Sequence, residues 1–128
     1  MLPRLSNVPQ LNNVVSDYLC ELQKQHFEGD IASNYADRLS LATDNSVYQQ
    51  LPQAILFPKS VADIVRITKL ANKEKYLHLT FTPRGGGTGT NGQSINNNII
   101  VDLSRHMTGI LELNIEERWV RVQAGVVK

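Results

Sequence analysis

The order strand, helix, strand in the middle of the chain constrains its fold more than any other feature. Residues 54–57 are a short apolar run, which is typical of a buried strand. Ser60 and Asp63 form a capping box, and apolar side chains at helical spacing predict a helix over 61–74. Residues 77–82 alternate apolar and polar side chains, as strands do. A right-handed crossover between two parallel strands is therefore expected.

Further helices are expected on the N-terminal side of this unit. Apolar spacing predicts an amphipathic helix over about 10–27, with Gly29 as its stop, and a shorter helix over 34–41. In the helix expected over 61–74, one broad face should be apolar. That face comprises Val61, Ile64, Val65, Ile67, Thr68 and Ala71.

Strands dominate the part that follows. Residues 99–103 read as a strand, and residues 110–113 and 119–124 read as an antiparallel hairpin. In the second hairpin strand, Val120, Val122 and Ala124 are expected to face inward, and Trp119, Arg121 and Gln123 outward. The polar residues Glu112, Glu116, Glu117 and Arg118 are expected to form a solvated tip.

These elements predict an α+β fold in three parts. Residues 1–50 form an N-terminal helical extension, whose first residues are kept extended by Pro3 and Pro9. Residues 51–94 form a small βαβ unit with parallel strands, and residues 95–128 supply the first strands of an antiparallel unit. Because the chain stops on an apolar step, we expect it to be truncated.

Composition narrows the classes of function. The chain has 13 Lys and Arg against 12 Asp and Glu, and this near-neutral balance argues against nucleic-acid binding. A single cysteine, Cys20, excludes an internal disulfide or a thiolate metal cluster within these residues, and it is expected to be a buried, inert thiol. Without an apolar membrane span or a leader-like start, a soluble cytoplasmic protein is expected, with peripheral membrane association left open.

Five of the eight glycines fall between Pro83 and Gly92. Each glycine forgoes about 0.4–1 kcal/mol of stability relative to alanine, so a chain that keeps five together needs the backbone they provide. Glycines let a ligand approach main-chain N–H groups, and consecutive inward-turned amides bind anions. Thr88, Thr90 and Asn91 add short polar groups that could reach phosphate or sugar. The loop therefore predicts a phosphate-binding site, with a flexible surface loop as the alternative.

The kind of phosphate ligand can be narrowed further. Residues 87–92 satisfy the dinucleotide-binding pattern, but a strand rather than a helix is expected after them. Gly87 and Gly92 also have the spacing of a triphosphatase loop, but Gln93-Ser94 stands where lysine followed by serine or threonine is required. A loop without lysine suits a diphosphate held mainly by amides. Arg84 could pair with that phosphate or make a structural bond, and both roles stay open.

Several polar residues are expected to be structural. His26, His78 and His106 share no metal-ligand spacing, and each is expected on the surface or in a local hydrogen bond. Asp44 is expected to cap backbone N–H groups of its own turn, and Trp119 to serve in packing or as a strand-face residue. No catalytic residue and no metal ligand is assigned.

Several motifs together resemble a known family. They are Pro52-x-Ala54 with Pro58-x-Ser60, the string from Thr82 to Gly89, Ile100 to Arg105, and Val122-x-Ala124-Gly125-Val126. In order and spacing they resemble the vanillyl-alcohol-oxidase type of FAD-binding domain. The segment from Thr43 to Tyr48 and the string from Thr82 to Gly92 are most similar to the large bacterial D-2-hydroxyglutarate dehydrogenases of the D-lactate dehydrogenase and glycolate oxidase group.

The resemblance implies an FAD cofactor, a glycine loop around its diphosphate, and hydride transfer from a small D-2-hydroxy acid. It places the cofactor against Arg84, Gly85, Gly86, Gly87, Thr88, Gly89, Thr90, Asn91 and Gly92, and near Gly125 and Val126. It also implies an iron–sulfur region farther along the parent polypeptide. We expect the chain alone to be inactive. A non-enzymatic nucleotide- or phosphate-binding module remains the alternative function, and a scaffold domain without any ligand is a third.

Overall fold

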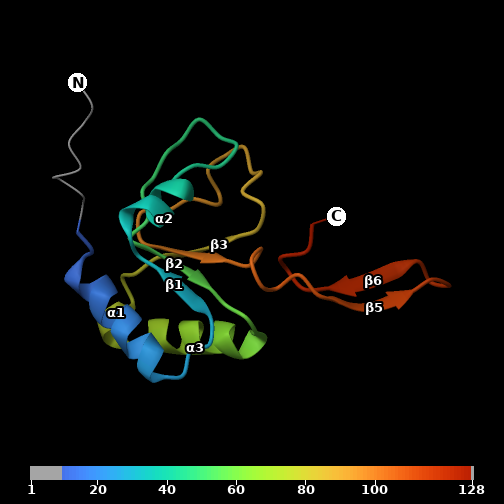
Figure 1. Ribbon diagram of the computed structural model, residues 1–128, viewed down its shortest axis with the longest axis horizontal. Helices are drawn as coiled ribbons and strands as arrows, with labels where there is room; N and C mark the ends of the chain where they lie inside the picture. The colour runs from blue at the N-terminus through green and yellow to red at the C-terminus, as the bar shows by residue number, and fades with distance from the viewer. Residues whose placement is uncertain (1–9, 128) are drawn as a thin grey trace.

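A computed structural model of the chain describes residues 10–127; the segment expected to be extended at Pro3 and Pro9 lies outside these residues. It confirms a mixed fold of helices and strands (Figure 1). In chain order the elements are α1 (Asn13–Lys24), β1 (Asp30–Ala32), α2 (Tyr35–Ser40), β2 (Ala54–Phe57), α3 (Val61–Ala71), the 3-10 helix η2 (Glu74–Tyr76), β3 (Phe81–Arg84), β4 (Ile99–Asp102), β5 (Ile110–Asn114) and β6 (Trp119–Val122).

Four strands form one sheet in the order β1-β2-β4-β3. Strands β2 and β3 both run parallel to β4, as the strand–helix–strand pattern predicts, but β4 lies between them. The sheet therefore extends across the division expected at residues 94 and 95. Strand β1, which pairs antiparallel with β2, was not predicted, because its three residues are too few to show a period.

The main core lies between this sheet and helices α1 and α3, which cover the same face (Figure 1). Its buried members include Val15, Tyr18, Leu19 and Leu22 from α1, Ile67 and Leu70 from α3, and Leu56, Ile99 and Val101 from the sheet. The Tyr18 hydroxyl donates a 2.9 Å hydrogen bond to the Ile67 carbonyl and so joins the two helices. The N-terminal helix is therefore part of the core.

The end of α1 differs from the prediction. His26, with φ of 58°, takes the left-handed conformation there, not Gly29. Gly29 is needed for another reason, because a Cβ at this position would lie 2.4 Å from the Phe57 carbonyl oxygen. Cys20 is exposed rather than buried, because α1 turns the adjacent Leu19 into the core instead.

Helix α3 begins as predicted and ends earlier. The Asp63 N–H donates a 3.3 Å hydrogen bond to the Ser60 hydroxyl, which confirms the cap. The predicted apolar face is partly wrong, since Val61 and Val65 are exposed. The strand predicted over 77–82 begins only at Phe81. The chain first turns Tyr76 inward, where its ring packs edge-on against another tyrosine, and leaves Leu77 exposed.

Strand β3 forms one edge of the sheet and contains Pro83. The carbonyls of Thr80 and Arg84 accept hydrogen bonds from β4 and the residue after it, at 3.2 and 2.8 Å. Because alternate residues of a strand face opposite edges, Pro83 faces the open side, where its missing N–H breaks no pairing.

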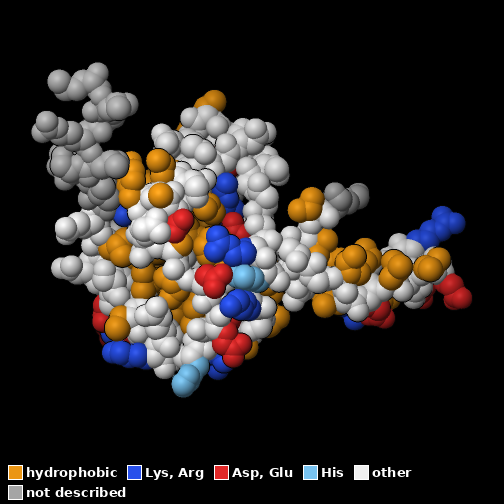
Figure 2. All heavy atoms as spheres, viewed as in Figure 1, with side chains coloured by type: hydrophobic (Ala, Val, Ile, Leu, Met, Phe, Trp, Pro, Cys, Tyr) orange, Lys and Arg blue, Asp and Glu red, His pale blue; other side chains and the backbone are white. Residues whose placement is uncertain are grey.

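The predicted antiparallel hairpin is confirmed as β5 and β6, and it projects as an arm from the body of the protein (Figure 1). The prediction that Val120, Val122 and Ala124 face inward is wrong, because all three are exposed. The pairing of Ile110 with Val122 and of Leu113 with Val120 puts these four apolar side chains on one uncovered face. Figure 2 shows hydrophobic side chains along the arm.

Candidate functional site

The glycine loop leaves the sheet at the carboxyl end of β3, where Arg84 is the register partner of Asp102 at the end of β4. Residues 85–98 contain neither helix nor strand, and they form the whole connection between these two parallel strands. This agrees with the expectation that no helix follows the dinucleotide-like pattern. Ligands of parallel sheets bind outside the carboxyl ends of strands, so the loop lies where a ligand is expected.

The glycines of the loop fall into two groups. Gly87 and Gly92 have φ of 66° and 75°, a conformation that side chains disfavour, and a Cβ on Gly89 would lie 2.5 Å from the Gln93 side chain. Gly85 and Gly86 differ, because neither has a positive φ. A Cβ on Gly85 would meet nothing within 4 Å, and one on Gly86 would meet only the Thr88 methyl group at 3.6 Å. The fold of the described chain therefore gives no reason for glycine at these two positions.

A hollow of about 400 Å³ with both polar and apolar lining, which we call the arginine hollow, opens beside Gly85 and Gly86. Its lining comprises Leu41, Phe57, Arg84, Gly85, Gly86, Asp102, Ser104 and Arg105. The Arg105 guanidinium lies over the Phe57 ring, 3.4 Å from its centroid, and 3.6 Å from Asp30. In Figure 2 basic side chains gather with acidic ones and a histidine on the face of the body, toward the side from which the arm projects.

A second polar hollow, the hydroxyl hollow, lies on the other side of Arg84 and also has a volume of about 400 Å³. It is lined by Ser40, Thr43, Asp44, Asn45, Arg84, Gly87 and Thr88. Hydrogen bonds from Ser46 and then Ser94 hold the pKa of Asp44 below its ordinary value, so this carboxyl is ionised at neutral pH. The hydroxyl hollow sets one guanidinium against Asp44, whereas the arginine hollow sets two guanidiniums against Asp102, which makes the arginine hollow the better place for a diphosphate.

Arg84 borders both hollows, so both of its predicted roles keep a structural basis. Its Nη1 donates a long, 3.4 Å hydrogen bond to the Ser94 carbonyl, which is a structural bond across the loop. The same side chain lines the arginine hollow, where a guanidinium can pair with phosphate oxygens.

The residues predicted as a site are brought together only in part. Arg84, Gly85 and Gly86 line the arginine hollow, and Gly87 and Thr88 line the hydroxyl hollow. The remaining predicted residues, Gly89, Thr90, Asn91, Gly92, Gly125 and Val126, line neither.

Gly125 is nevertheless closely tied to the end of β4. A Cβ there would lie 2.0 Å from the carbonyl oxygen of Leu103, and its N–H donates a 2.9 Å bond to the Met107 carbonyl. Close packing by itself therefore requires glycine at position 125.

Sequence reasoning missed several residues that line the hollows. Asp102 and Arg105 follow the buried run of β4, and their place at the carboxyl end of a parallel strand is a signal that could have found them. Asp44 was expected only to cap its own turn. It does so through a 2.9 Å bond from the Ser46 N–H, but it also accepts a 3.0 Å bond from the Ser94 hydroxyl.

The three histidines lie as expected. His26 and His78 are exposed, and His106 Nε2 lies 2.7 Å from Asp30 Oδ2. Between residues 10 and 127, no group of three or more His, Cys, Asp or Glu side chains is placed to hold a metal ion. In the same range, no helix is long and apolar enough to cross a membrane.

The arginine hollow fits the diphosphate of a dinucleotide such as FAD. The fold does not require glycine at Gly85 or Gly86. Because these residues have no side chain, an anion has room to approach their amide N–H groups. Two guanidiniums beside them offer charge-assisted hydrogen bonds, which contribute about 1.5–3 kcal/mol each. With Asp102 as the one acidic side chain in the lining, the donor set suits an anionic group such as a diphosphate.

Comparison with known proteins defines the class. Residues 52–127 match the family described as FAD binding domain, and the chain belongs to this family. The fold of alkyldihydroxyacetonephosphate synthase is similar, with a TM-score of 0.75 and 18% identity over 97% of this chain and 25% of that chain.

Two relatives show a closer similarity. The whole chain is 81% identical to part of D-2-hydroxyglutarate dehydrogenase of Haemophilus influenzae, where it spans 12% of the length. It is 57% identical to the enzyme of the same name from Escherichia coli, where it spans 13%. The resemblance found in the sequence is thereby confirmed, and the chain spans about an eighth of the length of these relatives.

Proposed function

We propose that this chain is the diphosphate-binding part of a longer FAD-dependent dehydrogenase that oxidises a D-2-hydroxy acid, of the 2-hydroxyglutarate or lactate type. The family and the names of the relatives support this proposal. Bound FAD would supply the redox chemistry, as the acceptor of a hydride from the substrate. The part of the chain described here supplies binding and orientation of the cofactor, and no catalytic base is assigned to it.

One observation carries the proposal: Gly85 and Gly86 are glycines where the fold would accept a side chain. Their place in the arginine hollow explains this, because a Cβ would occupy the space that a diphosphate oxygen needs. Arg84 and Arg105 are proposed to pair with oxygens of the diphosphate. Residues 87–92, with Gly125 and Val126, are proposed to complete the surroundings of the cofactor.

The hairpin of β5 and β6 is proposed as the start of a second, antiparallel unit of the same cofactor domain. Its uncovered apolar face supports this, because a two-stranded hairpin alone is marginally stable in water. Further strands of the longer polypeptide would cover that face.

The test compares Gly85→Ala and Gly86→Ala with the parent in the longer protein, using FAD and ADP titrations and turnover of D-2-hydroxyglutarate and D-lactate. Both variants should keep or gain stability without cofactor, by about 0.4–1 kcal/mol. Their dissociation constants for FAD should rise at least about tenfold, because a methyl group displaces a charged oxygen.

Gly109→Ala is the matched control, since Gly109 lies outside both hollows and the atom nearest to its Cβ would be the end of the flexible Gln123 side chain, at 3.0 Å. Unchanged FAD binding in Gly85→Ala and Gly86→Ala would refute the proposed function. A parent protein that binds ADP as tightly as FAD would favour the non-enzymatic nucleotide-binding module instead.

A further inference from the structure

The segment of residues 44–48, between α2 and β2, contacts the glycine loop at three places. Two of them are hydrogen bonds. The Asn45 N–H donates to the Gly87 carbonyl at 3.1 Å, and the Ser94 hydroxyl donates to Asp44 Oδ2 at 3.0 Å. In Figure 1 the two loops lie together above the sheet.

The third contact is the Tyr48 ring, which lies against Gly92. A Cβ added to Gly92 would lie only 3.1 Å from Tyr48 Cδ2, so the ring packs directly on the glycine. The segment 44–48 therefore contacts both Gly87 and Gly92, the two glycines of the described chain that have a positive φ. These two residues set the direction of the chain on either side of residues 88–91.

Asp44 is itself firmly held. Its other oxygen, Oδ1, accepts a 2.9 Å hydrogen bond from the Ser46 N–H, so the carboxylate is fixed by its own turn before it reaches the loop. It is ionised at neutral pH, and a hydrogen bond to a charged acceptor is stronger than a neutral one. The bond from Ser94 therefore fixes the far end of the glycine loop to a rigid point.

We propose that Asp44 and Tyr48 are positioning residues that hold the glycine loop in its cofactor-binding shape before the cofactor arrives. The proposal rests on the proposed function of the loop. A glycine-rich segment loses much conformational freedom when it is ordered, and a loop that is already ordered pays less of this entropy on binding. Neither residue needs to touch the cofactor to affect its affinity.

The test measures the FAD dissociation constant and dissociation rate in the longer protein, with the thermal midpoint of the cofactor-free form beside them. Asp44→Ala and Ser94→Ala each break the same bond, so each should weaken FAD binding about tenfold. The double variant should bind FAD no more weakly than Asp44→Ala, since the two residues act through one contact. Ser94→Ala leaves the turn at Asp44 intact, so it remains informative if Asp44→Ala does not fold.

Conservative variants separate positioning from general destabilisation. Asp44→Asn can still accept from Ser46 and meet the Ser94 hydroxyl with its amide, so FAD binding should stay within about threefold of the parent. Tyr48→Phe should also keep FAD binding close to that of the parent, whereas Tyr48→Ala should weaken FAD binding. Glu116→Ala, an exposed carboxylate on the hairpin turn, is the control and should bind FAD as the parent does.

The outcomes distinguish this inference from the proposed function. If Gly86→Ala weakens FAD binding but Asp44→Ala and Ser94→Ala do not, the positioning role is wrong and the proposed function stands. If the losses in the two single variants simply add in the double variant, the positioning role is also overturned. If Gly85→Ala and Gly86→Ala leave FAD binding unchanged, the proposed function fails and this inference fails with it.

Discussion

Arg84 and Asp102 are register partners at the carboxyl ends of the parallel strands β3 and β4. Each residue also accepts hydrogen bonding at the point where its strand ends. The Arg84 carbonyl accepts a 2.8 Å bond from the Leu103 N–H, and Asp102 accepts from the N–H and the hydroxyl of Ser104, at 2.9 and 2.7 Å. The walls of the arginine hollow are therefore fixed to the sheet itself.

Asp102→Ala should lower the free energy of unfolding by about 1–3 kcal/mol, because it removes a buried carboxylate that accepts two hydrogen bonds from the half-buried Ser104. Denaturant unfolding of the cofactor-free protein measures this. Asp102→Asn keeps one acceptor oxygen and should lose less. Equal losses in the two variants would contradict this account.

Asp63 makes a stronger structural contribution. It is fully buried and accepts from the N–H groups of Glu28 and Lys59, at 3.1 and 3.0 Å, and from Arg66 Nη1 at 2.9 Å. Asp63→Ala leaves these donors without their acceptor and should destabilise the fold by about 3–5 kcal/mol, as measured by denaturant unfolding. The exposed control Glu74→Ala should change stability by less than about 0.5 kcal/mol. A loss of similar size in both would refute the assignment.

Two glycines should respond in opposite ways to the same substitution. Gly125→Ala should cost at least about 2 kcal/mol, because its Cβ would lie 2.0 Å from a main-chain oxygen that cannot easily move. Gly85→Ala is the matched control and should be neutral or stabilising before cofactor binds. Thermal unfolding of the cofactor-free protein checks both, and a tolerated Gly125→Ala would show that Leu103 can shift.

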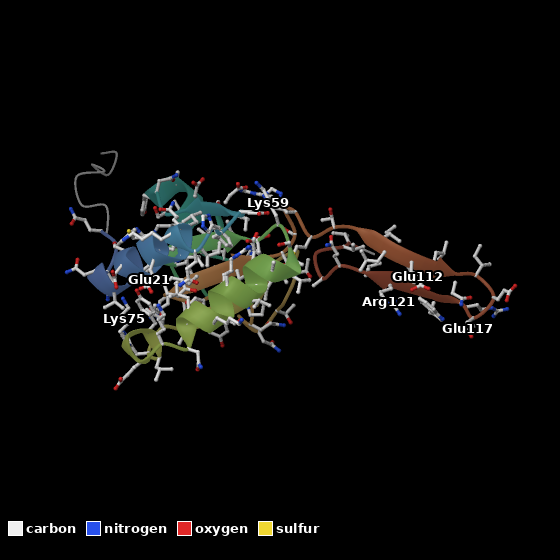
Figure 3. All side chains as sticks on the ribbon, turned by 90° about the horizontal axis from the view of Figure 1, so that it is seen from below. Glu21, Lys59, Lys75, Glu112, Glu117 and Arg121 are labelled. Atoms are coloured by element: carbon white, nitrogen blue, oxygen red, sulfur yellow. The ribbon has the colours of Figure 1, made fainter. Side chains whose placement is uncertain are left out.

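Glu21 should make stability depend on pH. Hydrogen bonds from Lys73, then Lys75 and Tyr76, lower its pKa from 4.5 to about 2, and Figure 3 shows Glu21 beside Lys75. The folded-state pKa lies below the ordinary value, so this contribution is complete above about pH 4.5 and is lost as pH falls toward 2.

Glu21→Gln should therefore lower the denaturant midpoint at pH 7, and its difference from the parent should shrink between pH 4.5 and pH 2. The exposed carboxylate variant Glu116→Gln is the control and should show no such difference. A difference for Glu21→Gln that stays constant down to pH 2 would rule out the ion cluster as its cause.

The uncovered face of the hairpin should make the 128-residue chain associate when it is prepared alone. Ile110, Leu113, Val120 and Val122 are exposed together on that face. Leu113→Lys should reduce association in sedimentation velocity over a range of concentrations, because it puts a charge into the patch. Leu77→Lys, at a single exposed apolar residue elsewhere, should not. A parent chain that stays monomeric would contradict this.

Local pattern was enough to predict β2, β4, the hairpin and the start of α3, because each of these has a clear period or cap. The local sequence pattern was not enough where a contact between residues distant in the chain determines the structure. Tyr76 breaks the alternation of residues 77–82 by packing on Tyr18, and only the folded chain brings these rings to 5.1 Å. The burial of the hairpin was mispredicted for a similar reason, since alternation does not show whether anything covers the face.

For the site, the sequence identified the loop but not which glycines serve a ligand. Gly87 and Gly92 need their left-handed conformation and a Cβ at Gly89 would displace the Gln93 side chain, whereas Gly85 and Gly86 have space and no positive φ. That distinction depends on the folded backbone and on what surrounds each glycine. The contacts of Asp44 with Ser94 were also beyond local reasoning, because fifty residues separate the two in the chain.

Pro83 has a consequence for the chain while it folds. Strand β3 lies at an edge of the sheet and leads directly into a loop with small side chains. An edge strand of this kind is a surface on which a second molecule could add a strand. A proline facing outward offers no donor there, so a foreign strand would lose one rung of the ladder at the entrance to the loop. The Pro83 ring, which follows the predicted alternation, thus disfavours pairing of this edge with a second molecule.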